Sequence, residues 1–402
     1  MRRPRAAVLG AGIMGSSLAI FLARRGVDVL LVDRADAPVA GSSRWNEGKI
    51  HLGYLYGADP SLATARHILP GGLRFAPLMS ELVGEDISSH ATTSDDTYLI
   101  HRRSVVDLDA LRPRFHAVAE LARSHPDAAS YLTDLSRAEV TEIPRGELDA
   151  LATDNIVAGF RVPERSVETR WLADRLAAAV AAEPRVTLRL GTTVTGTTPV
   201  ESPAGPWRVH GTPDLDERVD VVLNALWEGR LAVDRVAGLT PDYAWTHRYR
   251  LCLFARTARP VDVRSAIAAV GPFGDVKSFA GRDFYLSWYP VGLVAQGDEL
   301  VPPPPRILSG PEETRFVEQV RAGLESVMPG VGRVLDEAEE VLIRGGYVFA
   351  RGSGSIADAA SALHRRDRFG VERRGAYLSI DTGKYSTAPW VADRLAREIA
   401  DT

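Results

Sequence analysis

The chain has 402 residues, of which 45% are apolar and 25% charged, and its formal net charge is −4. This length is enough for two or three domains with sizeable cores, and the composition is typical of a folded globular protein. The weak negative charge argues against a nucleic-acid-binding surface. The single cysteine, Cys252, excludes an intrachain disulfide framework and a cysteine-rich metal site. We therefore expect a cytoplasmic protein with a buried, inert thiol.

Membrane, export and metal signals are weak. No run reaches the roughly 18 apolar residues that a membrane helix needs, so we expect no integral membrane segment. Met1-Arg2-Arg3 and the apolar run behind it resemble a secretion signal, but that run is short and contains three glycines. The nine histidines show no metal-binding spacing, so we predict no metal site.

The N-terminal segment predicts a strand at 6–9, a G-x-G-x-x-G turn, a helix up to residue 25 and a second strand at 29–32. Gly10 permits the tight turn, Gly12 lets the backbone approach a pyrophosphate, and Gly15 lets helix and strand pack closely. The helix N-terminus offers N–H groups and the positive end of its dipole. An acid after the second strand suits a ribose hydroxyl and disfavours NADP. The segment therefore predicts NAD or FAD binding by Gly10, Gly12, Ile13, Met14, Gly15, Asp33 and Arg34.

The rest of the chain alternates between helical and strand patterns. Residues 41–57 are irregular, polar and rich in glycine, and 302–305 are four prolines in a row. Apolar periodicity predicts helices at 63–82, 105–124, 168–182, 314–327 and 388–400. Strands are expected at 186–190, 219–225, 249–255, 266–270, 284–289, 293–296 and 376–380.

This order predicts the class α/β plus α+β. A Rossmann-like dinucleotide domain would hold an inserted substrate domain built on an antiparallel sheet. The dinucleotide domain is expected to comprise residues 1–78, 155–242 and 339–402, and the substrate domain residues 79–154 and 243–338.

Three segments resemble the FAD-dependent D-amino acid oxidase superfamily, which includes glycine and sarcosine oxidases, L-2-hydroxyglutarate dehydrogenase and glycerol-3-phosphate dehydrogenases. The first is the N-terminal fingerprint. The second, Asn46-Glu47-Gly48-Lys49-Ile50-His51, is similar to the Asn-Ser-Gly-x-Ile-His stretch that runs beside the isoalloxazine ring in 2-hydroxyglutarate dehydrogenases. The third, Thr382-Gly383-Lys384-Tyr385-Ser386-Thr387, is similar to the Gly-Gly-Lys-x-Thr-Thr segment of glycerol-3-phosphate dehydrogenases but departs from it at Thr382.

The resemblance implies FAD as the cofactor. Reduced flavin accumulates negative charge near N1, and a helix capped by Ser386 or Thr387, with the Lys384 charge, would stabilise it. An ordinary capped helix is the alternative interpretation. The further residues assigned to FAD are Ser42, Ser43, Arg44, Asn46, Gly48, Lys49, Ile50, Val194, Asn224, Ala225, Gly383, Lys384, Tyr385, Ser386 and Thr387.

The resemblance also points to catalytic candidates. His51 would act as a base, a substrate hydrogen-bonding group or a flavin attachment point, unless it is only structural. Arg344 and Arg351 lie in a stretch similar to the strand that carries the carboxylate-binding arginine of amino acid oxidases, with surface salt bridges as the alternative. Tyr285 and Tyr54 complete the set; Tyr285 alternates with Tyr289 on an expected strand and would line the site or pack the sheet.

Together these features predict an FAD-dependent oxidase or dehydrogenase. It would remove a hydride from a CH–NH or CH–OH carbon of a small, carboxylate-bearing metabolite, with amines and amino acids favoured. Molecular oxygen or another acceptor would reoxidise the flavin. The alternatives are a flavin monooxygenase or halogenase that uses NAD(P)H, a non-catalytic flavoprotein subunit of a larger complex, and an NAD-dependent dehydrogenase.

Overall fold

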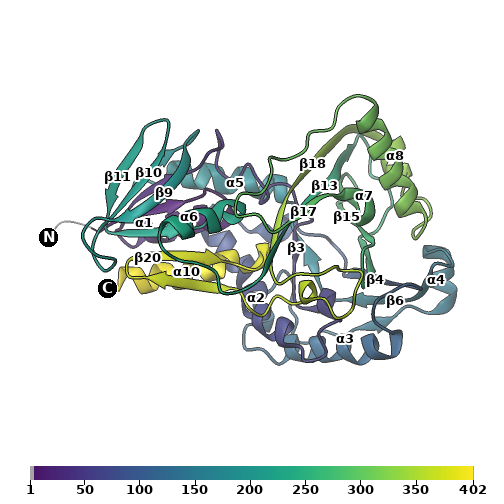
Figure 1. Cartoon of the computed structure of the whole chain (residues 1–402). Helices are drawn as coiled ribbons and strands as arrows, with labels where there is room; N and C mark the ends of the chain where they lie inside the picture. Colours follow the sequence, from purple (N-terminus) through teal and green to yellow (C-terminus); the bar gives the residue numbers. More distant parts are fainter. Residues whose placement is uncertain (1–3, 402) are drawn as a thin grey trace.

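The computed structural model describes residues 4–401. One end of the molecule, on the left of Figure 1, is built on a six-stranded sheet of order β19-β20-β12-β1-β2-β8. Its parallel strands are β1 (Arg5–Leu9), β2 (Asp28–Val32), β8 (Val186–Arg189), β12 (Val221–Asn224) and β20 (Tyr377–Asp381), with β19 (Gly370–Arg374) antiparallel at the edge. β1 and β2 are apolar and almost fully buried, because other elements cover both faces of the sheet.

Alternate residues of β1 pack against different layers. Ala6 and Val8 share a core with helices α1 (Ile13–Arg24), α5 (Thr169–Ala182) and α10 (Ala388–Ala400) and with α2 (Ala63–Val83). Ala7 and Leu9 share a core with the small sheet of β9 (Thr193–Pro199), β10 (Trp207–Thr212) and β11 (Leu215–Val219), and with α6 (Arg230–Val236). This two-sided burial confirms the Rossmann-like part of the predicted fold.

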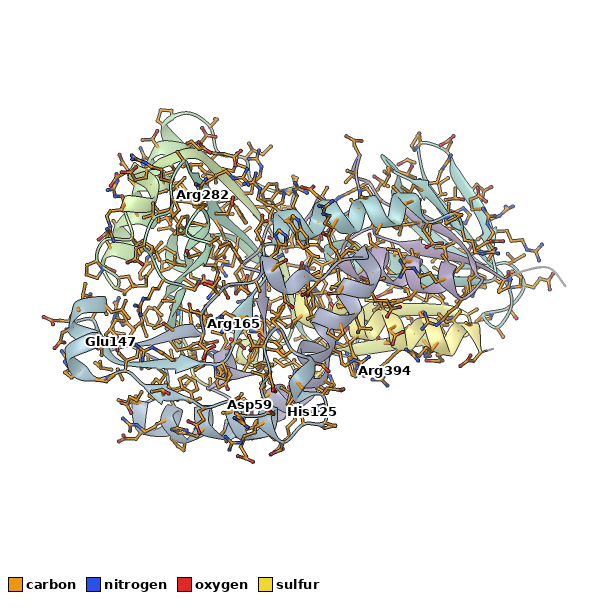
Figure 2. All side chains as sticks on the ribbon, turned by 180° about the vertical axis from the view of Figure 1, so that it is seen from behind. Asp59, His125, Glu147, Arg165, Arg282 and Arg394 are labelled. Atoms are coloured by element: carbon orange, nitrogen blue, oxygen red, sulfur yellow. The ribbon has the colours of Figure 1, made fainter. Side chains whose placement is uncertain are left out.

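The other end is built on a nine-stranded sheet. Its order is β17 (Leu293–Gly297), β13 (Trp245–Thr257), β16 (Asp283–Trp288), β15 (Gly274–Phe279), β14 (Ala266–Ala269), β4 (Asp96–His101), β6 (Ile156–Val162) and β5 (Thr141–Glu142), and β18 (Ala338–Arg351) also pairs with β13. Only β14 and β4 pair in parallel, so the predicted antiparallel sheet is confirmed. Figure 2 shows the molecule from behind. Glu147 lies at the outer edge of the end built on the nine-stranded sheet, and Arg394 lies on α10 in the end built on the six-stranded sheet.

Shorter elements complete the structure. They are β3 (Lys49–Ile50) and β7 (Arg165–Ser166), which pair with each other, and the helices α3 (Leu108–Arg123), α4 (Arg145–Leu151), α7 (Tyr289–Gly292), α8 (Pro311–Glu325) and α9 (Arg333–Asp336). Short 3-10 helices occur at Tyr54–Tyr56, Ile87–His90, Ala128–Ser130, Trp227–Gly229, Ala362–His364 and Tyr385–Thr387. In the part of the chain that the structure describes, no helix is long and apolar enough to cross a membrane.

The two faces of the nine-stranded sheet differ in polarity. On β13, Leu251 and Leu253 pack in a core with Phe316 of α8. Cys252 and Phe254 point the other way, and Phe254 contacts Trp45 from the segment after β2, with ring centroids 5.1 Å apart. Because side chains alternate along a strand, Arg248 and Arg250 share the second face. The sheet therefore presents charged side chains toward the parallel-sheet half of the molecule.

The segment limits differ from those predicted at two points. β6 lies within 155–242 but pairs with β4 in the nine-stranded sheet, and β18 starts before 339 and pairs with β13 rather than returning to the parallel sheet. The chain returns there only at β19. A strand pattern shows which faces are apolar but not which sheet the strand joins, since partners are chosen by long-range pairing.

Candidate active site

A cavity of about 560 Å³ lies between the two halves of the molecule. It runs from the N-terminal fingerprint to the turn after β20, so it joins the first and third of the segments that the sequence singled out. The predicted residues that line it are Gly10, Gly12, Ile13, Met14, Asp33, Arg34, Ser42, Ser43, Asn46, Lys49, His51, Val194, Ala225, Gly383, Lys384 and Tyr385. Residues outside the prediction also line it, among them Glu47, Thr192, Trp227, Glu228, Tyr347 and Val348.

The fingerprint turn is shaped by close backbone contacts. Gly10 has a φ of +95°, which suits glycine, and a Cβ there would lie 2.7 Å from the carbonyl oxygen of Ala225. A Cβ on Gly15 would lie 1.7 Å from the carbonyl oxygen of Gly10, so only glycine lets α1 start this close to the turn. Asp33 accepts hydrogen bonds from the backbone N–H groups of Ala11 (2.6 Å) and Ala35 (2.8 Å), which fixes its carboxylate at the cavity wall.

Several predicted cofactor residues lie outside the cavity wall. Gly15, Gly48, Ile50, Ser386 and Thr387 are packed behind it.

Asn224 and Arg44 also stand apart from the cavity. The Asn224 amide donates to the backbone of Arg230 (3.0 Å), to Asp234 (2.9 Å) and to the Tyr377 hydroxyl (2.8 Å). Arg44 pairs with Asp174 at 2.6 Å. These two side chains support the walls in this structure.

The predicted side-chain cap of the last helix does not form. α10 starts at Ala388 as predicted and Thr387 occupies the N-cap position, but its hydroxyl donates to the carbonyls of Thr382 and Lys384 instead. Ser386 Oγ is buried without a hydrogen-bond partner. The turn through Gly383 (φ +66°) places those two carbonyls within hydrogen-bond distance of the Thr387 hydroxyl, which competes with capping of the helix.

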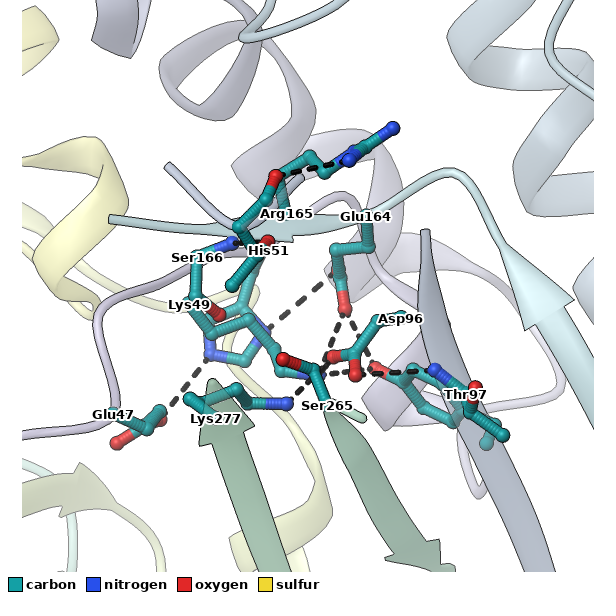
Figure 3. Close-up of polar contacts among 12 residues, drawn as sticks. Glu47, Lys49, His51, Asp96, Thr97, Glu164, Arg165, Ser166, Ser265 and Lys277 are labelled. Carbon is teal, nitrogen blue, oxygen red and sulfur yellow. Dashed lines mark hydrogen bonds and ion pairs between the residues drawn. The ribbon is translucent and has the colours of Figure 1, made fainter. Parts of the chain in front are cut away.

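His51 lies at the end of the cavity near Lys384 and is 1% exposed. Its Nε2 is 3.8 Å from Glu47 Oε1 and its Nδ1 is 4.0 Å from Glu164 Oε1, as Figure 3 shows. Burial and the charge of Lys384 lower the pKa of His51 to about 4, so the imidazole is neutral at pH 7. Burial acts to raise the pKa of Glu47, but His51, Lys384 and Arg250 outweigh it, and Glu47 is a carboxylate.

An ionic network lies directly behind His51. Lys49 and Lys277 both contact the carboxylate of Asp96, and Lys49 Nζ is also 3.4 Å from Glu164 (Figure 3). These four side chains are at most 3% exposed. Glu164 also accepts from the Tyr98 hydroxyl (2.6 Å) and the Leu52 N–H (2.7 Å). Lys49 is therefore held in the network, although it also lines the cavity.

Four further cations, whose charges act on Glu47 or on one another, form what we call the cation cluster; only Lys384 lines the large cavity. They are Arg248 and Arg250 from β13, Arg366 from the loop between β18 and β19, and Lys384. Among the residues that the structure describes, none of the four forms an ion pair. Arg248 donates to the Tyr289 hydroxyl at 3.0 Å, and Arg250 donates to Ser287 and stacks over the Tyr289 ring.

The two arginines predicted to bind carboxylate stand elsewhere. Arg351 pairs with Asp381 (3.1 Å) and Glu372 (2.7 Å), and Arg344 is exposed, where it lies over the Trp45 ring. Tyr285 contacts Cys252 Sγ at 3.1 Å, and Tyr54 packs among aromatic rings. None of the four lines the large cavity.

Sequence reasoning missed Arg248, Arg250, Arg366 and Glu47. Arg248 and Arg250 carried a usable signal, since two charges stand two residues apart and directly precede the apolar run Leu251–Phe254. Glu47 lay inside a highlighted segment but was assigned no role. Arg366 lies in an ordinary charged loop and carried no signal. Within residues 4–401, no cluster of His, Cys, Asp and Glu is arranged to hold a metal ion.

Comparison with known proteins agrees with this geometry. Glycine oxidase from Geobacillus kaustophilus superposes with a TM-score of 0.67 at 16% identity, covering 99% of this chain and 94% of that one. L-alpha-glycerophosphate oxidase from Mycoplasma pneumoniae gives 0.66 at 13% identity (100% and 96% covered), and L-proline dehydrogenase from P. horikoshii gives 0.63 at 14% (99% and 93%). These likenesses show a shared fold. Residues 5–348 match the DAO family of FAD-dependent oxidoreductases. The chain therefore belongs to this family and is an FAD-dependent oxidoreductase.

Proposed function

We propose that the chain oxidises a CH–NH or CH–OH carbon of a small, carboxylate-bearing metabolite, with amines and amino acids favoured. The observation that carries the proposal is the end of the large cavity, where the neutral imidazole of His51, the carboxylate of Glu47 and the amine of Lys384 meet. Bound FAD supplies the hydride acceptor, and oxygen or another acceptor completes the cycle.

The residues along the cavity fit FAD. Gly10, Gly12 and the N-terminus of α1 leave the backbone open for a pyrophosphate, and Asp33 stands at the wall where a ribose would lie. The cavity then continues past Asn46 to Lys384, which matches the need for a long, two-part ligand. We assign the adenosine half to the fingerprint and the flavin to the end near Lys384, whose charge would offset the negative charge of the reduced ring.

His51 would act as the base. Its neutral imidazole can accept the proton that leaves the substrate nitrogen or oxygen, and it lies beside the Glu47 carboxylate. Glu47 would then stabilise the imidazolium that forms, and Glu164 would orient the ring from the Nδ1 side.

The cation cluster supports a carboxylate on the substrate. A guanidinium binds a carboxylate through two parallel hydrogen bonds, and the Nε groups of Arg248, Arg250 and Arg366 are buried without an acceptor. A bound carboxylate would supply acceptors for these donors. The preference for amines rests on analogy, since glycine oxidase, proline dehydrogenase and iminodiacetate oxidase share the fold, although the glycerophosphate oxidase does too.

An anaerobic screen of amino and hydroxy acids with the FAD-loaded protein tests the proposal. At least one carboxylate-bearing compound should bleach the flavin absorbance without NAD(P)H. Bleaching only by NAD(P)H would instead favour the monooxygenase or halogenase alternative. A flavin that no compound reduces would support a non-catalytic subunit and remove the proposed oxidation.

His51→Ala tests the base. Removing a general base slows the step that it serves by about 10²- to 10⁴-fold, so the rate of flavin reduction should fall by at least about 100-fold. FAD affinity should change far less. His125→Ala, at a histidine in the loop after α3, is the matched control and should leave the rate unchanged. Equal reduction rates in His51→Ala and the unaltered protein would remove His51 from the chemistry.

A further inference from the structure

The cation cluster offers more buried donors than one carboxylate can accept from. Its four members form no ion pair within residues 4–401, and the Nε groups of all three arginines lack an acceptor. Arg248 is 5% exposed and Arg366 7% exposed, so bulk water reaches these guanidinium groups poorly. Buried charges are normally compensated by a partner.

Other nearby acids are already engaged. Asp381 acts on Arg366, but it forms ion pairs with Arg351 at 3.1 Å and Arg230 at 3.9 Å. Behind His51, Lys49 and Lys277 face Asp96 and Glu164, and the charge of Asp275 acts on both Lys277 and Arg250. Arg250 therefore has the charges of Glu47 and Asp275 nearby, whereas Arg248 and Arg366 form no ion pair within residues 4–401.

The cluster has two ends. The charges of Arg250 and Lys384 both lower the pKa of Glu47, so we place these two cations at the end that holds His51. The charge of Arg248 lowers the pKa of Arg366, and both arginines lower the pKa of Lys384, so we place Arg248 and Arg366 at the other end. Lys384 lines the large cavity and Arg366 lines a second, smaller cavity of about 60 Å³; Gly383 lines both, so the two cavities adjoin.

The donors at the far end lack acceptors. A guanidinium has five N–H donors, and the side chain of Arg248 makes one hydrogen bond, to Tyr289. Arg366 donates through one terminal nitrogen to the carbonyls of Leu363 and Arg365, and its Nε has no partner. The Tyr56 hydroxyl, whose charge when ionised would raise the pKa of Arg366, is also buried without a hydrogen-bond partner. The far end thus offers several buried donors to one ligand group.

We propose that the substrate carries a second anionic group, a carboxylate or a phosphate, which binds between Arg248 and Arg366 while its first carboxylate binds near Arg250 and Lys384. This inference rests on the proposed function and names the substrate class as a dianionic amino or hydroxy acid. Arg248 and Arg366 are then the residues that determine specificity for the second anionic group.

Ligand pairs of equal length test the inference without turnover. Glutarate and valerate differ by one carboxylate, and 4-phosphonobutyrate replaces that carboxylate with a phosphonate. Each is titrated into the FAD-loaded protein and its dissociation constant is read from the change in flavin absorbance. Because a hydrogen bond to a charged group contributes about 1.5–3 kcal/mol, glutarate should bind at least about tenfold more tightly than valerate. Tighter binding of 4-phosphonobutyrate than of glutarate would identify the second group as a phosphate.

Variants then locate the effect. Arg366→Met and Arg248→Met should weaken glutarate binding to the level of valerate and leave valerate unaffected. Arg373→Met is the matched control, since Arg373 is exposed, pairs with Glu398 and lines neither cavity. Equal affinities for glutarate and valerate in the unaltered protein would overturn the inference even if a variant failed to fold. An equal loss for both ligands in the Arg366 and Arg248 variants would also overturn it.

The outcomes separate this inference from the proposed oxidation. If no amino or hydroxy acid bleaches the flavin but glutarate binds more tightly than valerate, the oxidation fails and the second anion site stands. If glutamate and glutamine both bleach the flavin with equal apparent substrate constants, the oxidation stands and the second anion site fails.

Discussion

Two glycines of the fingerprint should respond differently to the same substitution, Gly→Ala. The Cβ of Gly15→Ala would lie 1.7 Å from the carbonyl oxygen of Gly10, a backbone atom that cannot rotate away. The Cβ of Gly12→Ala would lie 3.2 Å from Ser43 Oγ, the end of a flexible side chain. The first change therefore acts on the packing of α1 against the turn, and the second acts on the cavity wall.

The structure sets the size of each effect. Relief of the Gly15→Ala contact to an ordinary 3.4 Å requires a shift of α1 by roughly 1.7 Å. Overpacking of this kind costs about 1–3 kcal/mol, and alanine returns about 1 kcal/mol through its higher helix propensity. We therefore expect the apoprotein to lose about 1 kcal/mol of unfolding free energy. Gly12→Ala should change that free energy by less than about 0.5 kcal/mol but weaken FAD binding about tenfold or more, since one hydrogen bond to a charged phosphate contributes about 1.5–3 kcal/mol.

Urea unfolding of the apoprotein and FAD titration by fluorescence quenching measure the two quantities separately. Gly146→Ala is the control, because nothing lies within 4 Å of its Cβ position on α4. Gly146→Ala should leave the FAD dissociation constant unchanged, and it should leave the unfolding free energy unchanged or raise it slightly. The reasoning is refuted if apo Gly15→Ala unfolds at the urea concentration of the unaltered protein, or if Gly12→Ala keeps the original FAD dissociation constant.

Three further outcomes are expected. Asp96→Asn should lower the unfolding free energy by about 3 kcal/mol in urea, because it leaves two buried lysines without their shared partner. The control Asp95→Asn changes an acid that is 40% exposed and should cost less than about 1 kcal/mol in the same measurement. Burial and the charge of Arg366 lower the pKa of Lys384 to about 7, so titration of the holoprotein with valerate should show affinity falling as the pH rises through 7, and Lys384→Met should flatten this dependence. The pKa of His51 is lowered to about 4, so protonation of His51 should not slow flavin reduction, measured by stopped flow, between pH 8 and pH 6. A rate that falls as the pH drops from 7 to 6, in a way that His51→Ala abolishes, would contradict its neutral state.

The local sequence determined the dinucleotide-binding half. Gly10, Gly12 and Gly15 stand at fixed offsets between a buried strand and a helix, and Asp33 ends the next strand. Gly10 needs its positive φ, Gly15 packs on the carbonyl of Gly10, and Asp33 accepts from Ala11 and Ala35, so the turn depends mainly on neighbours close in the chain. The same holds for α10, which starts and ends at the predicted residues, because its apolar periodicity and the preceding turn are local.

Only the tertiary structure decided which cations meet at the substrate end. Arg248, Arg366 and Lys384 come from three separate elements, and an arginine pattern does not show whether the side chain finds a partner. Arg351 resembled a carboxylate-binding arginine but pairs with Asp381 and Glu372, whereas Arg248 finds no acid. The cause is long-range pairing. The β13–β18 ladder and the loop after β18 fix which side chains face the cavity, and no local pattern encodes that register.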